Sequence, residues 1–214
     1  MTRMKNVFLI LLAAFSIANV SCLPQSEGDI SAEAKESMQN GKQTTAAFVV
    51  EDPSEKLVDI IAQNNIRKSD LKIYIDKSDY YLAVKHADSV LITYPCVFGF
   101  NAVDDKAREG DGCTPEGSFG VRSMYAHKSW KYFIWIDYPN AESWRRFKQR
   151  KANGDLPMDA SIGGEVGIHG VPDGMDHMID KRNNWTLGCI SLKNEHITDL
   201  YKSINKFTKI EIVP

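Results

Sequence analysis

The segment from Asn184 to Asn194 reads NWTLGCISLKN, and an Ile-His-Gly tripeptide centred on His169 lies twenty residues upstream of its cysteine. This pairing predicts a thiol nucleophile, Cys189, and a base, His169. A free thiol has a pKa of about 8.5 and is mostly protonated at neutral pH, so it needs a neighbouring imidazole to become a good nucleophile. Gly188 has no β-carbon, so the backbone N–H groups of Gly188 and Cys189 could point together at a developing oxyanion.

The structural alternative is that Cys189 is a small buried hydrophobe and His169 a hydrogen-bonded core histidine. The surrounding residues favour the catalytic interpretation, because the stretch resembles the signature of the L,D-transpeptidase catalytic domain (YkuD) family. In that family a His-Gly pair precedes a Ser/Thr-x-Gly-Cys-aliphatic segment that ends in Asn. The matching residues here are His169, Gly170, Thr186, Gly188, Cys189, Ile190 and Asn194.

A second segment, from Lys106 to Val121, reads KAREGDGCTPEGSFGV and is similar to the Gly-Asp…Thr-Pro-x-Gly-x-Phe stretch of the same family. Two motifs in the right order are harder to obtain by chance than one. The stretch from Thr114 to Gly117 is also a good turn, since proline fixes φ and glycine accepts a positive φ. The resemblance covers about residues 70–214. It implies a mainly β fold, a β-sandwich or barrel with a few peripheral helices, in which Cys189 precedes a short strand beside a substrate channel.

Two residues depart from the family pattern. Leu187 stands where many members have His, and Ser191 stands where many have an Arg that helps to hold substrate. Leu187 cannot transfer a proton, so the resemblance implies that the carbonyl of Gly170 orients His169 and leaves its Nε2 facing the thiol. The missing arginine leaves the acyl donor open. The variant motif is closer to a subgroup of murein L,D-transpeptidases or peptidoglycan-editing amidases, so the direction of the reaction also stays open.

The resemblance therefore implies a cell-envelope cysteine enzyme that acts on peptidoglycan stem peptides through a thioacyl intermediate. An amine would resolve that intermediate as an L,D-transpeptidase does, whereas water would hydrolyse a cross-link or a protein–peptidoglycan link. A protein of another class, a catalytically silent peptidoglycan-binding lipoprotein, stays open as well. The site assignments are Cys189 and His169 as catalytic residues, Gly188, Gly170 and Thr186 for the oxyanion and positioning, and Trp185, Asn194 and Ser191 for substrate.

No cofactor is expected, because thiol chemistry supplies its own activated nucleophile. No metal site is expected either, since the sequence has neither a Cys-x-x-Cys nor a His-x-x-x-His spacing. His177 is interpreted as a loop residue, and a role in a lid that faces the substrate stays open. Cys96 and Cys113 are a candidate disulfide pair, because Cys189 must stay free to act.

The N-terminal sequence predicts export. Arg3 and Lys5 form a basic region before an apolar run from Val7 to Val20, which is too short for a comfortable membrane span. Residues 1–21 are interpreted as a signal peptide and Cys22 as a lipidated first residue, with ordinary cleavage or an uncleaved anchor as alternatives. The expected location is the periplasm or cell envelope, with membrane attachment at Cys22.

Composition indicates one catalytic domain, assigned to residues 51–214, behind a polar flexible tether at residues 22–50. The formal net charge of −2 gives no reason to expect a nucleic-acid partner. The basic run from Arg145 to Lys151 is interpreted as a solvated helix face, with contact to anionic glycan or lipid headgroups as the weaker option. The sequence does not predict an oligomeric state.

Periodicity predicts a helix from Pro53 to Ala62 with Asp52 as its N-cap, followed by a β-meander. The insertion at residues 137–163 is expected to determine specificity, although Trp144 and Phe147 fit a helix face packed on the domain better than a ligand surface. The other predicted strands are Leu71–Asp76, Tyr80–Lys85, Val90–Phe98, Ser118–Tyr125, Tyr132–Ile136, Gly167–Ile168 and Lys209–Val213, and the other predicted helices are Ala141–Ala152 and Asn194–Asn205.

Overall fold

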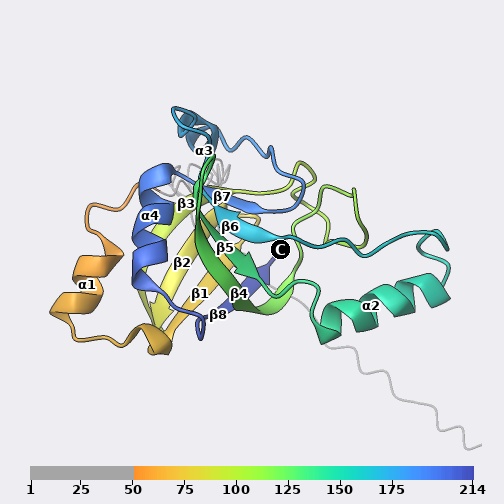
Figure 1. Ribbon diagram of the computed structural model, residues 1–214, viewed down its shortest axis with the longest axis horizontal. Coiled ribbons are helices and arrows are strands. Elements are labelled where there is room, and N and C mark those ends of the chain that lie inside the picture. Colours follow the sequence, from red (N-terminus) through yellow and green to blue (C-terminus); the bar gives the residue numbers. More distant parts are fainter. Residues whose placement is uncertain (1–50) are drawn as a thin grey trace, which may run out of the picture. The chain divides into compact units, whose positions relative to one another are not determined.

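The computed structural model describes residues 51–214, so the predicted signal peptide, the lipidation at Cys22 and the tether lie outside the described residues. The described part is mainly β, as predicted: its strands close into a barrel in the order β1-β2-β3-β7-β6-β5-β4-β8 (Figure 1). The strands are β1 (Leu71–Asp76), β2 (Tyr81–His86), β3 (Ser89–Val97), β4 (Gly117–His127), β5 (Lys131–Ile136), β6 (Gly167–His169), β7 (Ile190–Leu192) and β8 (Lys209–Val213).

Alternating burial explains why these segments form strands. Every second residue of β1, from Leu71 to Ile75, is buried, and β8 repeats the pattern with Ile210 and Ile212. The last strand closes the barrel, because Ile210 pairs in parallel with Ile73 of β1 and antiparallel with Phe119 of β4. The hydrophobic core includes the fully buried side chains of Tyr94, Phe98, Ile134, Ile168 and Ile190.

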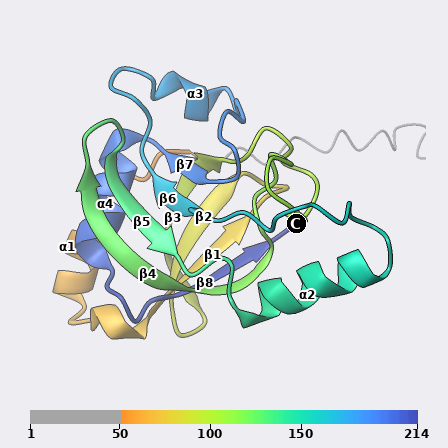
Figure 2. The same ribbon diagram turned by 45° about the vertical axis from the view of Figure 1, so that its right-hand side comes forward.

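Two helices pack together on the outside of the barrel, α1 (Leu57–Gln63) and α4 (Asn194–Ser203) (Figures 1 and 2). Helix α1 begins at Leu57 rather than at the predicted Pro53, and Asp52 does not cap it. The buried carboxylate of Asp199 in α4 takes that role, accepting hydrogen bonds from the N–H groups of Leu57 at 2.7 Å and Val58 at 3.1 Å. A cap supplied from the far end of the chain leaves no local sequence signal.

The remaining helices lie in the connections. Helix α2 (Ala141–Ala152) has its predicted bounds and is capped by Asn140, whose side chain accepts a hydrogen bond from Ser143 N. His177 opens the one-turn helix α3 (His177–Asp180), which corrects its interpretation as a loop residue. A 3₁₀ turn, η2 (Lys68–Asp70), precedes β1. Within residues 51–214, none of the helices has the length and apolar character needed to cross a bilayer.

The candidate disulfide between Cys96 and Cys113 is absent, and both residues are buried free thiols. Cys96 belongs to β3 and packs in the core cluster, whereas Cys113 lies in the loop before β4, where its Sγ contacts the carbonyl of Asp111 at 3.5 Å. The two cysteines are thus held in separate packing environments.

Candidate active site

Adjacent parallel strands carry the predicted nucleophile and base. His169 is the last residue of β6, and Cys189 directly precedes β7. The register pairs Ile168 with Ile190 and His169 with Ser191. Both His169 and Cys189 line one cavity of about 940 Å³, so the fold brings together the pair that the sequence singled out.

The cavity is lined on one side by aromatic rings of the β4–β5 hairpin and on the other by the nucleophile segment and two glycine-rich loops. Its lining residues are Lys106, Glu109, Gly110, Tyr125, His127, Trp130, Phe133, Trp135, Gly163, Gly164, Glu165, Val166, His169, Trp185, Thr186, Leu187, Gly188 and Cys189. A volume of this size accommodates a peptide segment, because pockets for small ligands span roughly 300–1,000 Å³.

The orientation of His169 is fixed by a hydrogen bond and by ring packing. Its Nδ1 lies 2.7 Å from the carbonyl oxygen of Gly170, the contact that the family resemblance implied. Because a carbonyl only accepts, Nδ1 carries the proton and Nε2 keeps a free lone pair. The ring stacks on Trp130 at a centroid distance of 4.4 Å and on Phe133 at 5.7 Å, and Trp185 meets it edge-on.

Burial sets the charge state of the pair. Desolvation, which the Gly170 hydrogen bond only partly opposes and to which His127 adds a smaller effect, lowers the pKa of His169 to about 4. Although the Cys189 side chain is partly exposed, the atoms packed around its sulfur desolvate it and raise the thiol pKa to about 11, against the opposing effects of Gly167 N–H and the Lys106 cation. At neutral pH the pair is therefore an uncharged thiol and an uncharged imidazole.

The loop before Cys189 is organised by Thr186. Its Oγ1 accepts a hydrogen bond from Gly188 N at 3.2 Å and donates one to the carbonyl of Cys189 at 2.7 Å. The Gly188 N–H is thus occupied, which corrects the prediction that it faces an oxyanion together with the Cys189 N–H. The Cys189 N–H has no hydrogen-bond partner among residues 51–214 and remains the candidate oxyanion donor.

Gly188 is required for a different reason. Its φ of +139° lies where side chains are rarely tolerated, and a β-carbon there would meet the carbonyl oxygen of Cys113 at 2.6 Å. The glycine therefore lets the nucleophile segment pack against the loop that contains Cys113.

The predicted substrate residues separate into two groups. Trp185 lines the cavity, and its Nε1 is buried without a hydrogen-bond partner among the described residues. Ser191 does not, because its side chain is fully buried and contacts the Gly170 carbonyl at 3.4 Å. Asn194 is also absent from the lining, and its backbone N–H donates to Asp176. Ser191 and Asn194 thus pack around Gly170, which corrects their assignment as substrate contacts.

The insertion at residues 137–163 contributes only Gly163 to the cavity lining. Helix α2 instead buries Phe147 and braces the loop before β4, because Arg150 contacts Asp105 at 2.8 Å and Arg146 contacts it at 3.5 Å. Trp144 remains 43% exposed. The expectation that this insertion determines specificity is therefore not supported by the cavity lining, whereas the burial of Phe147 agrees with a helix face packed on the domain.

Sequence reasoning missed Lys106 and the aromatic wall of Trp130, Phe133 and Trp135. The alternation of ring-bearing residues along β4 and β5 was a usable signal, because such residues share one face of a hairpin. For Lys106 the sequence offered only its place in the second motif.

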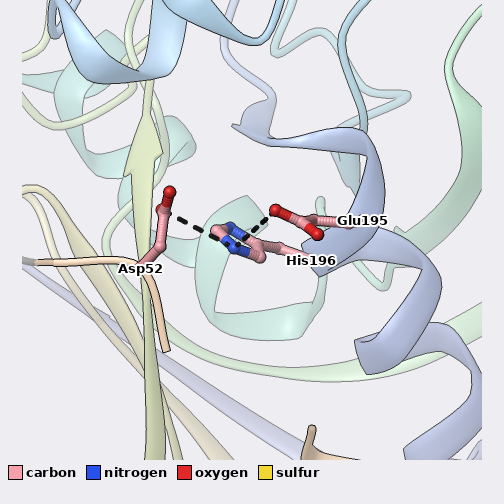
Figure 3. Close-up of side chains that lie close together, drawn as sticks. All are labelled: Asp52, Glu195 and His196. Atoms are coloured by element: carbon pink, nitrogen blue, oxygen red, sulfur yellow. Dashed lines mark ion pairs between the residues drawn. The ribbon is translucent and has the colours of Figure 1, made fainter. Parts of the chain in front are cut away.

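A group with potential metal ligands lies outside the cavity, at the start of α4 (Figure 3). His196 Nε2 lies 3.6 Å from a carboxylate oxygen of Asp52 and 3.8 Å from one of Glu195. The ammonium of Lys193 already contacts Asp52 at 2.5 Å and Asp180 at 2.6 Å, and it supplies the positive charge that a metal ion would bring. These residues therefore form an ion-pair cluster between the segment before α1 and helix α4.

The family model for the L,D-transpeptidase catalytic domain, YkuD, matches residues 70–212. The comparison with curated protein sequences gave no match. Among solved structures, Bd1075 from Bdellovibrio bacteriovorus is 21% identical with a TM-score of 0.47, over 67% of this chain and 48% of that one.

Two further solved structures are similar. The helical cell shape determining protein Pgp2 from Campylobacter jejuni is 16% identical, with a TM-score of 0.48, over 73% of this chain and 55% of that one. An L,D-transpeptidase from Mycobacterium smegmatis is 13% identical, with a TM-score of 0.44, over 68% and 59%. The chain spans about half the length of the first solved proteins it matches.

Proposed function

Because the chain belongs to the L,D-transpeptidase catalytic domain (YkuD) family, we propose that it is a cysteine acyltransferase that acts on peptidoglycan stem peptides. One observation carries the proposal. Cys189 and His169, which match the family motif, lie at the ends of two adjacent parallel strands and line one cavity. The carbonyl of Gly170 fixes the tautomer of His169 there.

In the proposed first step, the sulfur of Cys189 attacks the carbonyl carbon of an L,D-peptide linkage. Because the thiol and the imidazole are both uncharged at neutral pH, the proton moves from sulfur to Nε2 of His169 as the S–C bond forms. The negative charge on the carbonyl oxygen is stabilised by the Cys189 N–H. The hydrogen bond to Gly170 stabilises the resulting imidazolium, as the third member of a triad does.

In the second step, the C–N bond breaks and the leaving amine takes the proton from His169. The thioacyl enzyme is then attacked by an acceptor amine, giving a new amide, or by water, giving hydrolysis. His169 removes a proton from either acceptor and returns it to the departing sulfur. The rings of Trp130, Phe133 and Trp185 pack around the imidazole and limit its contact with water.

Mass spectrometry of purified muropeptides after incubation with the full-length protein tests the proposal. Cross-linked products support transfer, and shortened stems without cross-links support the hydrolytic alternative. Cys189→Ala is the control and should abolish both while keeping the melting temperature of the wild type. Undiminished turnover by Cys189→Ala would overturn the assignment, and inertness of wild type towards every muropeptide would favour a silent peptidoglycan-binding protein.

We also propose an envelope location with a lipid on Cys22, supported by the basic and apolar sequence before it. Intact mass of the mature N-terminus tests this, because an unmodified terminus at Leu23 or later rules out lipidation.

A further inference from the structure

We propose that Lys106 is the carboxylate-binding residue of the cavity and selects substrates with an anionic group beside the bond that Cys189 attacks. The identity of that substrate as a stem peptide rests on the proposed function above. The recognition of a carboxylate by Lys106 rests on the free donors of its ammonium and on its position beside Gly188, because the lining also contains two carboxylates, Glu109 and Glu165.

Lys106 is the single Lys or Arg among the residues that line the cavity. Its side chain is only 4% exposed, and a β-carbon placed on Gly188 would lie 3.6 Å from its Nζ. The ammonium therefore sits next to the residue that precedes the nucleophile. Its charge also acts on the Cys189 thiol, whose pKa it lowers against the larger effect of burial.

The ammonium has unused hydrogen-bonding capacity. A lysine carries three N–H donors, and within residues 51–214 Nζ of Lys106 is hydrogen-bonded only to Asp111, at 2.8 Å. Buried donors are normally satisfied, because an unfilled one costs free energy. Two open donors on a buried ammonium at a cavity wall indicate that the ligand supplies oxygen acceptors.

The ion pair with Asp111 leaves Lys106 able to bind a further carboxylate. The carboxylate of Asp111 also accepts hydrogen bonds from three backbone N–H groups, those of Ala107, Arg108 and Cys113, at 2.7, 2.8 and 3.0 Å. These amides stabilise the negative charge of Asp111 without the lysine. Asp111 therefore aims Lys106 at the cavity and leaves it able to bind a second carboxylate.

Two tryptophans of the cavity lining carry donors that are covered by the protein. The indole Nε1 atoms of Trp135 and Trp185 are buried and have no hydrogen-bond partner among the described residues. An indole N–H can only donate. Because these Nε1 atoms are covered by the protein, the proposal rests on Lys106 and not on the indoles.

The test compares two alkylating reagents of similar size, iodoacetate, which carries a carboxylate, and iodoacetamide, which is neutral. The rate at which each modifies Cys189 in full-length protein is followed by mass spectrometry of the peptide that contains it. The ratio of the two rates cancels any change in thiol pKa. We expect Lys106→Gln to lower the iodoacetate/iodoacetamide ratio by about fivefold, as the loss of one partly shielded charge contact implies.

Two variants serve as matched controls. Lys106→Arg keeps the cation and should keep the ratio within about twofold of wild type. Arg108→Gln removes an exposed cation from the same loop, outside the cavity lining, and should leave the ratio unchanged. An unchanged ratio in Lys106→Gln, or an equal fall in Arg108→Gln, overturns the proposal.

A wild-type measurement avoids dependence on the folding of variants. At constant ionic strength, sodium acetate should slow the modification of Cys189 by iodoacetamide, and acetamide at the same concentration should not. Equal effects of the two additives would contradict a carboxylate site.

A stem peptide with a free C-terminal carboxylate, compared with its C-terminal amide, extends the test to turnover. Lys106→Gln should raise KM for the free acid and leave KM for the amide unchanged. If wild type turns over neither peptide, the proposed function fails, while the reagent ratio still decides the role of Lys106.

Discussion

The imidazole of His169 lies against the indole of Trp130, with ring centroids 4.4 Å apart and an interplanar angle of 21°. This stacking removes water from one face of the predicted base, and Phe133 covers it further at 5.7 Å. The site therefore pairs a neutral base with a protonated thiol, unlike sites that store a thiolate beside an imidazolium.

The low pKa of His169 predicts a pH-dependent stability. The folded-state pKa of about 4 lies below the unfolded value of about 6.5, so between these pH values the unfolded chain binds more protons. The contribution of neutral His169 to the free energy of unfolding is fully present above pH 6.5. It is lost as the pH falls towards 4, by up to roughly 3 kcal/mol. Urea unfolding of wild type and His169→Gln from pH 4 to 7 measures it. Parallel curves for the two proteins would contradict a buried neutral histidine.

The high pKa of Cys189 predicts how its reactivity depends on pH. With a thiol pKa of about 11, alkylation by iodoacetamide should rise close to tenfold per pH unit from pH 7 to 10. The rate constant at Cys189, measured by peptide mass spectrometry, checks this. A plateau that begins near neutral pH would instead reveal a thiolate–imidazolium pair.

Close packing around Gly170 predicts sensitivity to a single methyl group. A β-carbon there would lie 2.4 Å from Asn194 Oδ1 and 2.8 Å from the carbonyl of Trp130. Gly170→Ala should lower the free energy of unfolding by about 1–3 kcal/mol and reduce turnover by displacing the carbonyl that holds His169. Gly164→Ala is the matched control, since its nearest neighbour would be Pro139 at 3.8 Å. Equal melting temperatures for the two variants would refute the packing account.

Because Asp199 caps helix α1 from a distant part of the chain, its replacement should strongly lower the free energy of unfolding. Its carboxylate accepts hydrogen bonds from the N–H groups of Leu57 and Val58 and from the hydroxyl of Tyr94 at 2.8 Å. Asp199→Ala leaves these donors buried without an acceptor and should cost about 3 kcal/mol in chemical denaturation. The exposed Glu195 on the same helix is the control, and its replacement by Ala should stay within about 0.5 kcal/mol. A small effect of Asp199→Ala would show that water replaces the carboxylate.

Much of the barrel was predictable because its strands have one buried face. The bounds of β1, β8 and α2 agree with periodicity and capping, whereas β7 is three residues long and gives no periodic signal of its own. The pairing order of the strands depends on contacts between distant segments, which local patterns do not encode.

The residues of the site could be predicted where they are neighbours in the sequence and form a motif. The motif placed Cys189, Gly188 and Thr186 in one loop, but it did not show that Thr186 takes up the N–H of Gly188. The burial of Ser191 depends on the pairing of β7 with β6. The short distance between Lys106 and Gly188 depends on the packing of the loop before β4 against the nucleophile segment. Both are tertiary facts.

Strand β8 lies between β1 and β4, so the first strand of the barrel has only one neighbour until residues Lys209–Val213 are in place. A nascent chain that still lacks β8 exposes two unpaired sheet edges at once, and such edges invite pairing with other chains. Ribosome-bound intermediates should therefore remain vulnerable to aggregation until β8 has been synthesised, and a holdase that keeps the polypeptide extended up to that moment would favour the closed barrel over intermolecular pairing.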